Sequence, residues 1–370
     1  MSSEWVQLSE VAVHLHPDDP VAIAKRDLPA GLVLDGRLRL RQPIPSGHKL
    51  ALRPLATGEP VRRYGQIIGL ARQPIQPGEH VHVHNLGLEE LDRAPEFGAD
   101  TQPVTLVPEA ERRTFQGYRR PDGQVGTRNY VAVLSTVNCS AHVAREIAHH
   151  FSSERLAAFP HVDGVIALTH ALGCPLQQPT LQRTLAGMAR HPNVGAYLLV
   201  GLGCETNQAQ ALMDAYGLDA PALVIQELGG IGPTVEAGIA AVEALLPAVD
   251  AARRSAQPLS ALTLALQCGG SDAWSGVSAN PLVGLLADEV VRQGGTAVLA
   301  ETPEIYGAEH LLARRAASPE VGQKLLDAVA WWRAYAVRQG FALDDNRSVG
   351  NEAGGLTTIY EKSLGAVETC

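Results

Sequence analysis

The chain of 370 residues contains few cysteines, and the five that it has are an odd number. Such a set does not form a disulfide framework, so a reducing cytoplasm is the expected location. Long basic runs are also missing and the formal net charge is −9, which argues against a nucleic-acid-binding surface. No apolar run reaches the roughly 18 residues of a membrane span, so no membrane partner is expected. The first residues, MSSEWVQLSE, lack the charged start and apolar core of a secretory signal.

The motifs of several common enzyme classes are absent as well. There is no Walker-type loop, and no G-x-G-x-x-G follows the first strand of either predicted α/β unit. A dinucleotide-binding site therefore lacks support. The sequence also lacks a G-x-S-x-G nucleophile elbow. Its cysteines are not in C-x-x-C spacing, which argues against a structural zinc site.

The first part of the chain, residues 1–88, predicts a small β-rich domain. Its short apolar runs are separated by turn sequences at residues 29–31, 45–47 and 77–79, each containing proline and glycine. Residues 89–113 are polar, acidic and proline-bearing, which is typical of a linker. The alternative is a long ordered loop that packs on one of its neighbours.

From residue 114 onward, strands and helices alternate. Apolar strands such as NYVAVLST and VGAYLLVGL precede helical patterns, which predicts a parallel sheet covered on both faces over residues 114–257. Ser140 and Ser278 are the expected N-caps of two of the helices. A second α/β unit over residues 258–370 shows two strands, LTLALQ and TAVLA, and is expected to be incomplete. The predicted fold class is α/β with a small all-β domain in front.

Four cysteines, Cys139, Cys174, Cys204 and Cys268, occupy the same kind of position. Each follows an apolar run and precedes a helical pattern. Because ligands bind outside the carboxyl ends of strands in open α/β sheets, these thiols indicate a site. The alternative is that they are small buried hydrophobes. Glu205 adds a carboxylate beside a thiol, and both are metal ligands, although it could instead complement a helix N-terminus.

The segment QCGGSDAWSGVSANP, residues 267–281, gathers polar groups ahead of a predicted helix. Its paired glycines allow the backbone to approach a ligand, and a helix start favours an anionic ligand such as a carboxylate. The same residue types are also common caps and turn formers. The candidate substrate-binding side chains of this segment are Ser271, Asp272, Ser275 and Asn280.

The sequence HVHVHNL predicts a strand with His82 and His84 on one face, since alternate residues of a strand point the same way. Two imidazoles at this spacing can ligate a metal or act as acid and base. The alternative is the exposed face of an edge strand. Asn85 is a nearby polar candidate for substrate binding.

Other polar residues lie at or near predicted strand ends. Arg128 could clamp a substrate carboxylate bidentately, although surface ion pairs are more usual for arginine. Glu301 and Glu304 are candidates for a base or for metal ligands, or for the acidic start of a helix. Lys362 could be a base or a carboxylate binder, with a solvated lysine as the common alternative. Asn138 is a further candidate for substrate binding.

Five long segments together carry a family resemblance. FQGYRRPDGQVGTRNYV, GLGCETNQ, CGGSDAWSGVSANPLVG, AETPEIYGAEHLLARRA and NEAGGLTTIYEKSLGA resemble the altronate/galactarate dehydratase family. The N-terminal domain, which ends in GEHVHVHNL, is similar to the SAF (β-clip) domain that leads those enzymes. The resemblance implies a hydro-lyase that removes water from a sugar acid to give a 2-keto-3-deoxy product. It also implies a divalent metal, iron(II) or manganese(II).

The resemblance suggests roles for the candidates. His82, His84 and Lys362 would be catalytic, and Arg128 would bind the substrate carboxylate together with the helix start after Cys268. The residues that could hold the metal are Cys139, Cys174, Cys204, Glu205, Cys268 and Glu301. The expected partner is a small-molecule sugar acid, and the chain could form a homo-oligomer.

Family members run on past EKSLGA, where this chain stops, so a truncated chain is expected. One alternative is therefore a relative that binds sugar acids without turnover, or an inactive fragment. A second is an iron–sulfur dehydratase with the four strand-end cysteines around a cluster. A mononuclear metal ranks above the cluster because the cysteine spacings match no common cluster pattern.

Overall fold

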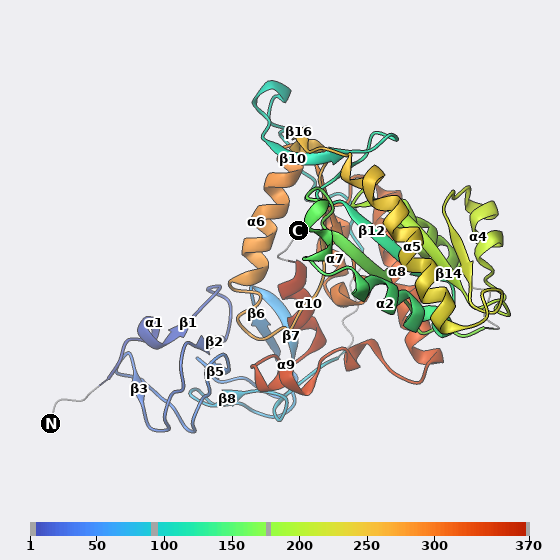
Figure 1. The fold of residues 1–370 in the computed structure, drawn as a ribbon. Coiled ribbons are helices and arrows are strands. Elements are labelled where there is room, and N and C mark those ends of the chain that lie inside the picture. The colour runs from blue at the N-terminus through green and yellow to red at the C-terminus, as the bar shows by residue number, and fades with distance from the viewer. Residues whose placement is uncertain (1–4, 90–94, 175–178, 368–370) are drawn as a thin grey trace. The chain divides into compact units, whose positions relative to one another are not determined.

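The computed structural model, drawn in Figure 1, describes residues 5–89, 95–174 and 179–367. The chain divides into two compact units. Unit 1 comprises residues 1–108 and 263–370, and unit 2 comprises residues 109–262. Each unit encloses apolar cores of its own.

The N-terminal part of unit 1 consists of short antiparallel strands, as predicted. Its elements are α1 (Leu8–Val11), β1 (Ala12–Val13), β2 (Val21–Ala24), β3 (Val33–Leu34), β4 (Leu38–Arg39), β5 (Lys49–Ala51), β6 (Pro60–Arg63), β7 (Gln66–Ala71), β8 (His80–Val81) and β9 (Leu86–Gly87). One sheet has the order β1-β2-β5-β8, a second has the order β6-β7-β9, and β3 pairs with β4. Two predicted turns place Gly31 and Gly47 at φ +84° and +80°, a backbone region that glycine adopts without strain.

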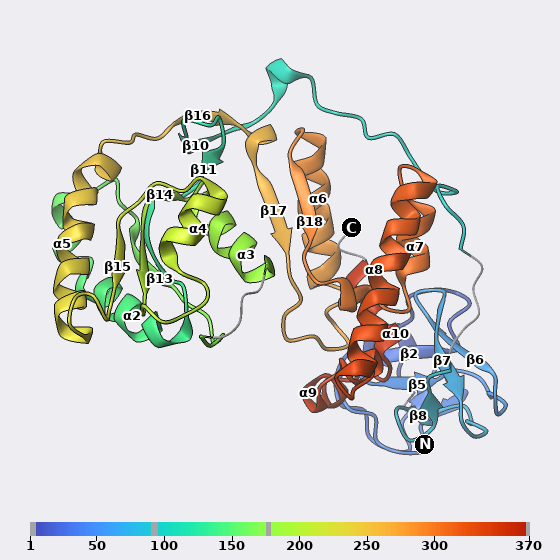
Figure 2. The same ribbon diagram turned by 90° about the vertical axis from the view of Figure 1, so that its right-hand side faces the viewer.

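The C-terminal part of unit 1 contains one pair of parallel strands and several helices. Its elements are β17 (Thr263–Leu266), α6 (Ala279–Arg292), β18 (Thr296–Leu299), η5 (Thr302–Ile305), α7 (Glu309–Arg314), α8 (Pro319–Arg338), η6 (Leu343–Asp345), α9 (Val349–Ala353) and α10 (Ile359–Val367). Strands β17 and β18 pair in parallel with Thr263 opposite Thr296, and α6 is their crossover. Figure 2 shows α10 beside the β6–β7 sheet of the N-terminal part.

The two parts of unit 1 share one apolar core. Val61 and Ile68 of the small sheet are buried together with Ile305, Val329 and Leu364. The exposed fractions of Val61 and Ile68 are 0%. Burial of this kind stabilises a fold by about 1.5–3 kcal/mol for each large aliphatic side chain. The β-rich domain and the C-terminal segment therefore fold against each other.

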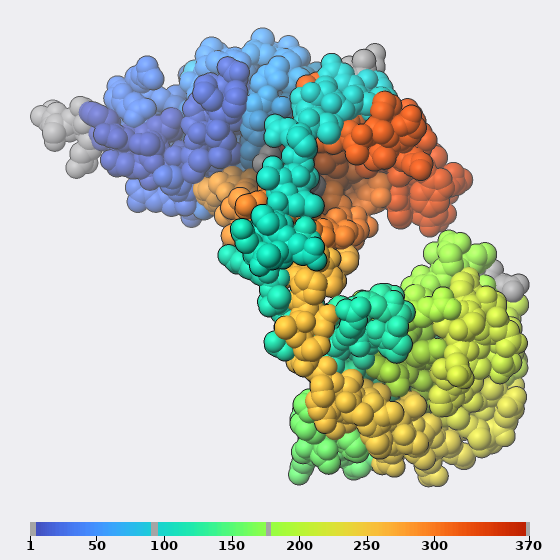
Figure 3. All heavy atoms as spheres, turned by 90° about the horizontal axis from the view of Figure 1, so that it is seen from above, coloured from blue at the N-terminus to red at the C-terminus, as the bar shows by residue number. Residues whose placement is uncertain are grey.

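Residues 95–107 lie against the helices of unit 1. Asp100 N donates to Arg314 O at 2.8 Å, and Val107 N donates to Arg292 O at 2.8 Å. The Thr101 hydroxyl donates to Ala316 O at 2.9 Å. In Figure 3 this segment, in teal, runs over orange and red residues of the same unit. Residues 95–107 therefore form an ordered loop packed on its neighbour, which was the alternative to a linker.

Unit 2 is built on a parallel sheet of the predicted kind. The sheet has the strands β12 (Tyr130–Ser135), β13 (Gly164–Leu168), β14 (Val194–Gly201) and β15 (Ala222–Val224). Their order is β13-β12-β14-β15, and all neighbours are parallel. The rest of the unit comprises η1 (Glu109–Glu111), β10 (Thr114–Arg119), β11 (Val125–Gly126), η2 (Asn138–Ser140), η3 (Arg155–Ala158), β16 (Ser255–Pro258), η4 (Leu259–Ala261) and four helices. Strand β10 pairs antiparallel with β11 and β16.

Helices cover both faces of the parallel sheet. Val131 and Val133 of β12 pack toward α2 (Ala141–His150) and α5 (Ile231–Asp250). The alternate residues Ala132 and Leu134 pack toward α3 (Pro179–Ala189) and α4 (Ala209–Tyr216). Both faces of the strand are buried, which explains its continuous apolar sequence. The sequence LQQPTLQRTLAGMAR, residues 176–190, predicts a helix here, and the first three of these residues lie outside the described residues.

Helix α5 is long and apolar enough to span a membrane by length and composition alone, with a mean hydropathy of 1.2. Only 22% of this window is buried inside the structure. Its Val242, Leu246 and Val249 nevertheless contribute to the core under the sheet. The core helix of a soluble protein passes the same test, so this one helix is weak evidence for a membrane span.

The two expected N-cap serines occupy the predicted positions but do not cap through their side chains. The Ser140 hydroxyl donates to Val137 O at 2.9 Å and to Val200 O at 2.7 Å. The Ser278 hydroxyl donates to Trp274 O at 3.0 Å. Both hydroxyls thus tie loops to neighbouring carbonyl groups, and this part of the prediction was wrong.

Candidate functional site

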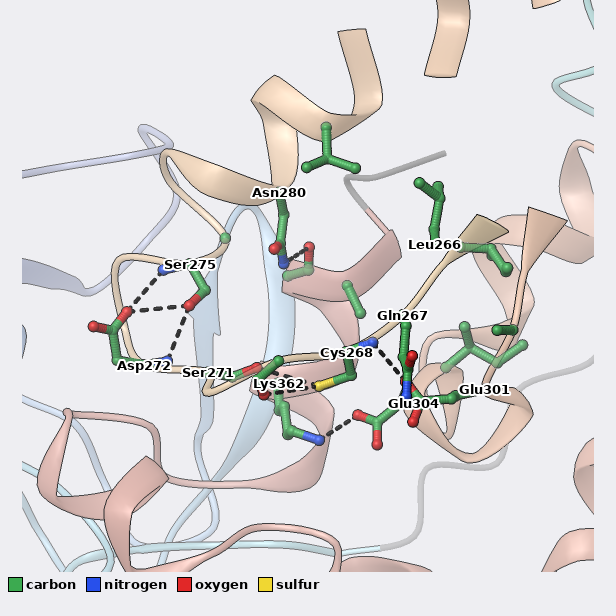
Figure 4. A pocket seen from close by; sticks show the side chains of 18 of the residues that line it. Leu266, Gln267, Cys268, Ser271, Asp272, Ser275, Asn280, Glu301, Glu304 and Lys362 are labelled. Atoms are coloured by element: carbon green, nitrogen blue, oxygen red, sulfur yellow. Dashed lines mark hydrogen bonds and ion pairs between the residues drawn. The ribbon is translucent and has the colours of Figure 1, made fainter. Parts of the chain in front are cut away.

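Unit 1 contains a cavity of about 360 Å³ at the carboxyl ends of β17 and β18. This is where open α/β sheets bind ligands, and the volume suits a small molecule. Leu264, Leu266 and Leu299 form part of an apolar wall. Polar side chains from the loop before α6, from η5 and from α10 face them (Figure 4).

The loop before α6 brings most of its predicted residues to the cavity. Cys268, Ser271, Asp272, Ser275 and Asn280 all line it. The Cys268 and Ser271 side chains lie 3.4 Å apart, Sγ to Oγ. Asp272 Oδ1 accepts from Trp274 N at 2.8 Å and from Ser275 N at 3.0 Å, which makes this carboxylate the brace of the loop.

Glu301 joins the ends of the two strands. Its Oε2 accepts from Cys268 N at 2.5 Å, and both residues line the cavity. The sequence placed a thiol and a carboxylate at two strand ends, and the parallel pairing of these strands brings them together.

Lys362 is a buried residue of the cavity wall, with an exposed fraction of 7%. Its ammonium group donates to Glu304 Oε2, and Glu304 Oε1 accepts from Asn346 Nδ2 at 2.8 Å. Figure 4 shows Lys362 directed at Glu304 beside Cys268. The common alternative, a solvated lysine, does not hold for this residue.

Two glycines allow α10 to approach the cavity loop closely. A Cβ on Gly276 would lie 2.9 Å from Gly365 Cα and would also collide with the Tyr64 hydroxyl. Asn280 Nδ2 donates to Gly365 O at 2.7 Å across the same contact. The substrate-binding role predicted for Asn280 therefore competes with a bond that fixes α10.

A buried cluster of charged side chains, which the sequence analysis missed, also holds α10 in place. Lys49 Nζ donates to Glu361 Oε1 at 2.8 Å, and Arg63 Nη1 donates to the same oxygen. The side chains of Lys49 and Glu361 are fully buried. Burial alone would raise the pKa of Glu361, but Lys49 and Arg63 outweigh it and lower that pKa to about 2. Burial lowers the pKa of Lys49 to about 8 despite this partner.

The histidines lie in the β-rich part of unit 1, and the strand predicted for them was wrong. Strand β8 ends at Val81, and Asn85 N donates back to His82 O at 3.0 Å to close a turn. Asn85 is buried; its Oδ1 accepts from His82 N and its Nδ2 donates to His80 O, both at 2.9 Å. Asn85 therefore shapes this turn, and its side chain is committed to backbone groups rather than to a substrate.

Four imidazoles gather around this turn. The rings of His48, His80 and His82 have centroids 4.8–5.2 Å apart, and that of His84 lies 5.5 Å from His80. Residues 351–353 connect this cluster to the cavity loop. On one side, Asn351 Nδ2 donates to Ser271 O at 2.7 Å. On the other side, His48 bonds to Ala353 O and His82 bonds to Glu352 O. None of the four histidines lines the cavity.

The hydrogen bonds fix the protons on these rings. His48 Nε2 lies 3.0 Å from Ala353 O and must carry the proton, because a carbonyl only accepts. In a neutral ring His48 Nδ1 is then the acceptor, so His80 Nε2, at 2.9 Å, is the donor. His82 Nε2 likewise donates to Glu352 O at 3.0 Å. Neutral His80 and His82 therefore each keep a lone pair on Nδ1.

Acid is expected to destabilise unit 1 through this cluster. Burial, followed by the neighbouring imidazoles His48, His82 and His84 and then Lys49, lowers the pKa of His80 from 6.5 to about 3. The unfolded chain then binds more protons than the folded chain between these values, so stability falls as the pH drops through this window. We expect the urea midpoint to fall between pH 7.5 and pH 5, and to fall less in His80→Gln.

The matched control is His16→Gln, which alters an imidazole of the same unit whose side chain is 45% exposed. It should keep the acid sensitivity of the unaltered chain. An unchanged pH dependence in His80→Gln would show that this cluster is not the acid-sensitive element.

The remaining predicted residues lie in unit 2. Arg128 is exposed at the amino end of β12, where its Nε lies 3.9 Å from Asp163 Oδ1. It thus stands at the opposite end of the sheet from the strand-end cysteines, in the ion pair that is usual for arginine. Asn138 lies at the carboxyl end of β12 and accepts from the Cys139 thiol at 3.3 Å.

Of the six predicted metal ligands, Cys268 and Glu301 belong to unit 1 and the other four to unit 2. Glu205 is buried, and its carboxylate accepts from Thr136 Oγ1 at 2.8 Å, Leu202 N at 3.0 Å and Gly203 N at 2.7 Å. Burial alone would raise the pKa of Glu205, but these bonds together lower it. Glu205 is thus already engaged as the brace of the loop that carries Cys204.

Comparisons with known proteins cover nearly the whole chain. Residues 10–89 match the model of the altronate/galactarate dehydratase SAF domain. Residues 117–250 match the second domain of D-galactarate dehydratase/altronate hydrolase, and residues 259–370 match the D-galactarate/altronate dehydratase C-terminal model.

Three curated relatives are similar over 96% of the chain. Altronate dehydratase of Bacillus subtilis (strain 168) is 34% identical, and this chain covers 73% of it. Altronate dehydratase of Escherichia coli (strain K12) is 38% identical, with 73% of it covered. Galactarate dehydratase (L-threo-forming) of E. coli is 34% identical, with 71% of it covered.

Proposed function

The chain belongs to the altronate/galactarate dehydratase family, a family of hydro-lyases, and from this premise we propose that it removes water from an altronate- or galactarate-type sugar acid. The product would be a 2-keto-3-deoxy acid. The observation that carries the proposal is the strand-end cavity of unit 1, in which Lys362 and Glu304, with side chains 6% and 15% exposed, form an ion pair beside hydroxyl and amide groups. A cytoplasmic location and a homo-oligomeric state belong to the same proposal.

Proton transfer is assigned to Lys362 and Glu304. Elimination of water requires a base for the weakly acidic α-proton and an acid for the departing β-hydroxyl. Glu304 offers a carboxylate and Lys362 an ammonium group, in direct contact with each other. The carboxylate takes the α-proton, the C–O bond breaks as the hydroxyl leaves with the ammonium proton, and the enol that remains becomes the 2-keto acid. His82 and His84 do not line this cavity, so the proposal gives them no step.

Serine side chains orient the substrate, while Asn280 holds α10 through its bond to Gly365 O. The Ser271 and Ser275 hydroxyls and the Asn280 amide border the cavity on the side of the α6 N-terminus. A helix start attracts a negative charge, so the substrate carboxylate is assigned to this side. Leu264, Leu266 and Leu299 form an apolar part of the cavity wall.

A divalent metal, iron(II) or manganese(II), completes the proposal. Cys268 and Glu301 supply a thiol and a carboxylate from adjacent strand ends, and both groups bind such ions. Among residues 5–89, 95–174 and 179–367, no three His, Cys, Asp or Glu side chains already stand together as a full ligand set. Oxygen atoms of the substrate would therefore complete the coordination. When bound, the ion would stabilise the negative charge that develops on the substrate.

The test is dehydration of a panel of sugar acids, with D-altronate and D-galactarate included. The reaction is run without oxygen, with added iron(II) or manganese(II), and 2-keto acid is measured. We expect product from at least one of the two acids and little product after chelation. Binding of a sugar acid without product would overturn the proposal in favour of a non-catalytic relative.

A further inference from the structure

Three cysteines of unit 2 follow three neighbouring strands of one parallel sheet. Cys139 follows β12, Cys174 follows β13 and Cys204 follows β14. Strand β12 lies between the other two. Because parallel neighbours end at the same edge of a sheet, the topology delivers the three thiols to one place.

Backbone hydrogen bonds hold the three loops together at this edge. Asn138 N donates to Leu172 O at 3.0 Å, which ties the loop of Cys139 to that of Cys174. Thr206 donates to Cys174 O from both its N and its Oγ1, each at 2.9 Å. The position of the thiols is thus built by main-chain contacts and by the buried Glu205.

Two of the three thiols lie close together without a disulfide between them. Cys139 Sγ and Cys174 Sγ lie 3.9 Å apart, far beyond the about 2.05 Å of a disulfide. Burial and the Cys139 thiol raise the pKa of Cys174, against a smaller opposing effect of the Cys204 thiol. Cys139 and Cys204 are exposed, so packing as small buried hydrophobes does not account for them.

We propose that Cys139, Cys174 and Cys204 form a trithiolate metal site in unit 2, separate from the cavity of unit 1. Thiolates at about 2.3 Å from a tetrahedral ion stand about 3.8 Å apart, close to the 3.9 Å between Cys139 and Cys174. The described side chains do not form a closed set of three ligands, so binding requires the three thiols to move together. The thiols release their protons as the metal enters, and solvent or a bound molecule takes the fourth position.

Three thiolate ligands favour a metal ion or cluster that binds sulfur strongly. Three thiolates suit zinc, ferrous iron or an iron–sulfur cluster, and they disfavour magnesium or calcium. The site does not depend on the proposed substrate, and its signature is metal content rather than turnover. A failure of the dehydratase proposal would therefore leave this inference standing, and the reverse also holds.

The experiment measures protection of individual thiols in the full chain. Apo protein, reduced and kept free of oxygen, is loaded with zinc, with iron(II), or with iron(II) and sulfide. Each sample is alkylated briefly and the label at every cysteine is read by mass spectrometry, alongside bound metal and acid-labile sulfide. We expect at least a tenfold slower labelling of Cys139, Cys174 and Cys204 in one of these samples. Protection by zinc or iron alone identifies a single ion, whereas protection that needs sulfide identifies a cluster.

Serine variants provide the control. Cys139→Ser, Cys174→Ser or Cys204→Ser should each abolish the protection of the two remaining thiols. Cys268→Ser, in unit 1, should leave the protection of all three unchanged. Equal labelling rates of the three thiols in apo and all loaded samples of the unaltered chain would overturn the proposal, whatever the variants do. Recovery of a Cys139–Cys174 disulfide in place of bound metal would overturn it as well.

Discussion

Glu361→Gln is expected to lower the free energy of unfolding of unit 1 by about 3–5 kcal/mol, because it leaves two buried cations without their counter-charge. The side chains of Lys49 and Arg63 are 0% and 1% exposed, and both bond to this carboxylate. Thr357 donates to it as well, from N at 2.8 Å and from Oγ1 at 2.6 Å. Glutamine keeps the shape and one acceptor but removes the charge. Urea denaturation at pH 7.5 measures the loss.

The matched control for this change is Glu59→Gln in the same β-rich part. Glu59 pairs with Arg53 at 2.5 Å, but the Arg53 side chain is 49% exposed, so the expected loss is about 0–1 kcal/mol. Similar losses in the two variants would contradict the view that the buried cluster joins α10 to the strands.

Local patterns predicted much of the fold. The short strands with Pro–Gly turns and the apolar strands of the parallel sheet were confirmed, because each depends on residues that are close in the chain. The strand over His82 and His84 was wrong for an equally local reason. Asn85 bonds to the backbone of His80 and His82 and turns the chain, and an alternating pattern does not reveal that competition.

For the candidate site too, only the features that depend on local sequence could be predicted. The polar loop before α6 and Glu301 could be found from the sequence, because strand ends of an α/β unit mark the site. The partnership of Lys49 with Glu361 could not, since the two residues are 312 positions apart. Lys362 was a catalytic candidate with a solvated lysine as its alternative, and the sequence could not decide between them because the burial of Lys362 depends on how α10 packs against η5. The one available sign of this buried cluster was the presence of charged residues within the otherwise apolar sequences of β5 and α10.

Lys362→Met is expected to reduce kcat for dehydration by about 10²–10⁴-fold, the usual contribution of a positioned acid or base. Methionine fills a similar volume, so the wall of the cavity is retained while the proton donor is lost. Glu304 then keeps its hydrogen bond from Asn346 Nδ2. A purely structural role for Lys362 would show as a loss of folded protein, so the urea midpoint is measured on the same preparations.

The control for this last change is Lys324→Met, which removes an exposed lysine of α8 and should leave kcat and KM unchanged. Lys362→Arg separates two roles of the ammonium group. Arginine keeps the positive charge beside Glu304 but does not release a proton at working pH, so KM should be nearly retained while kcat stays low. If Lys362→Arg restored kcat, charge alone would suffice, and the proton donor of the elimination would have to be another group of the cavity.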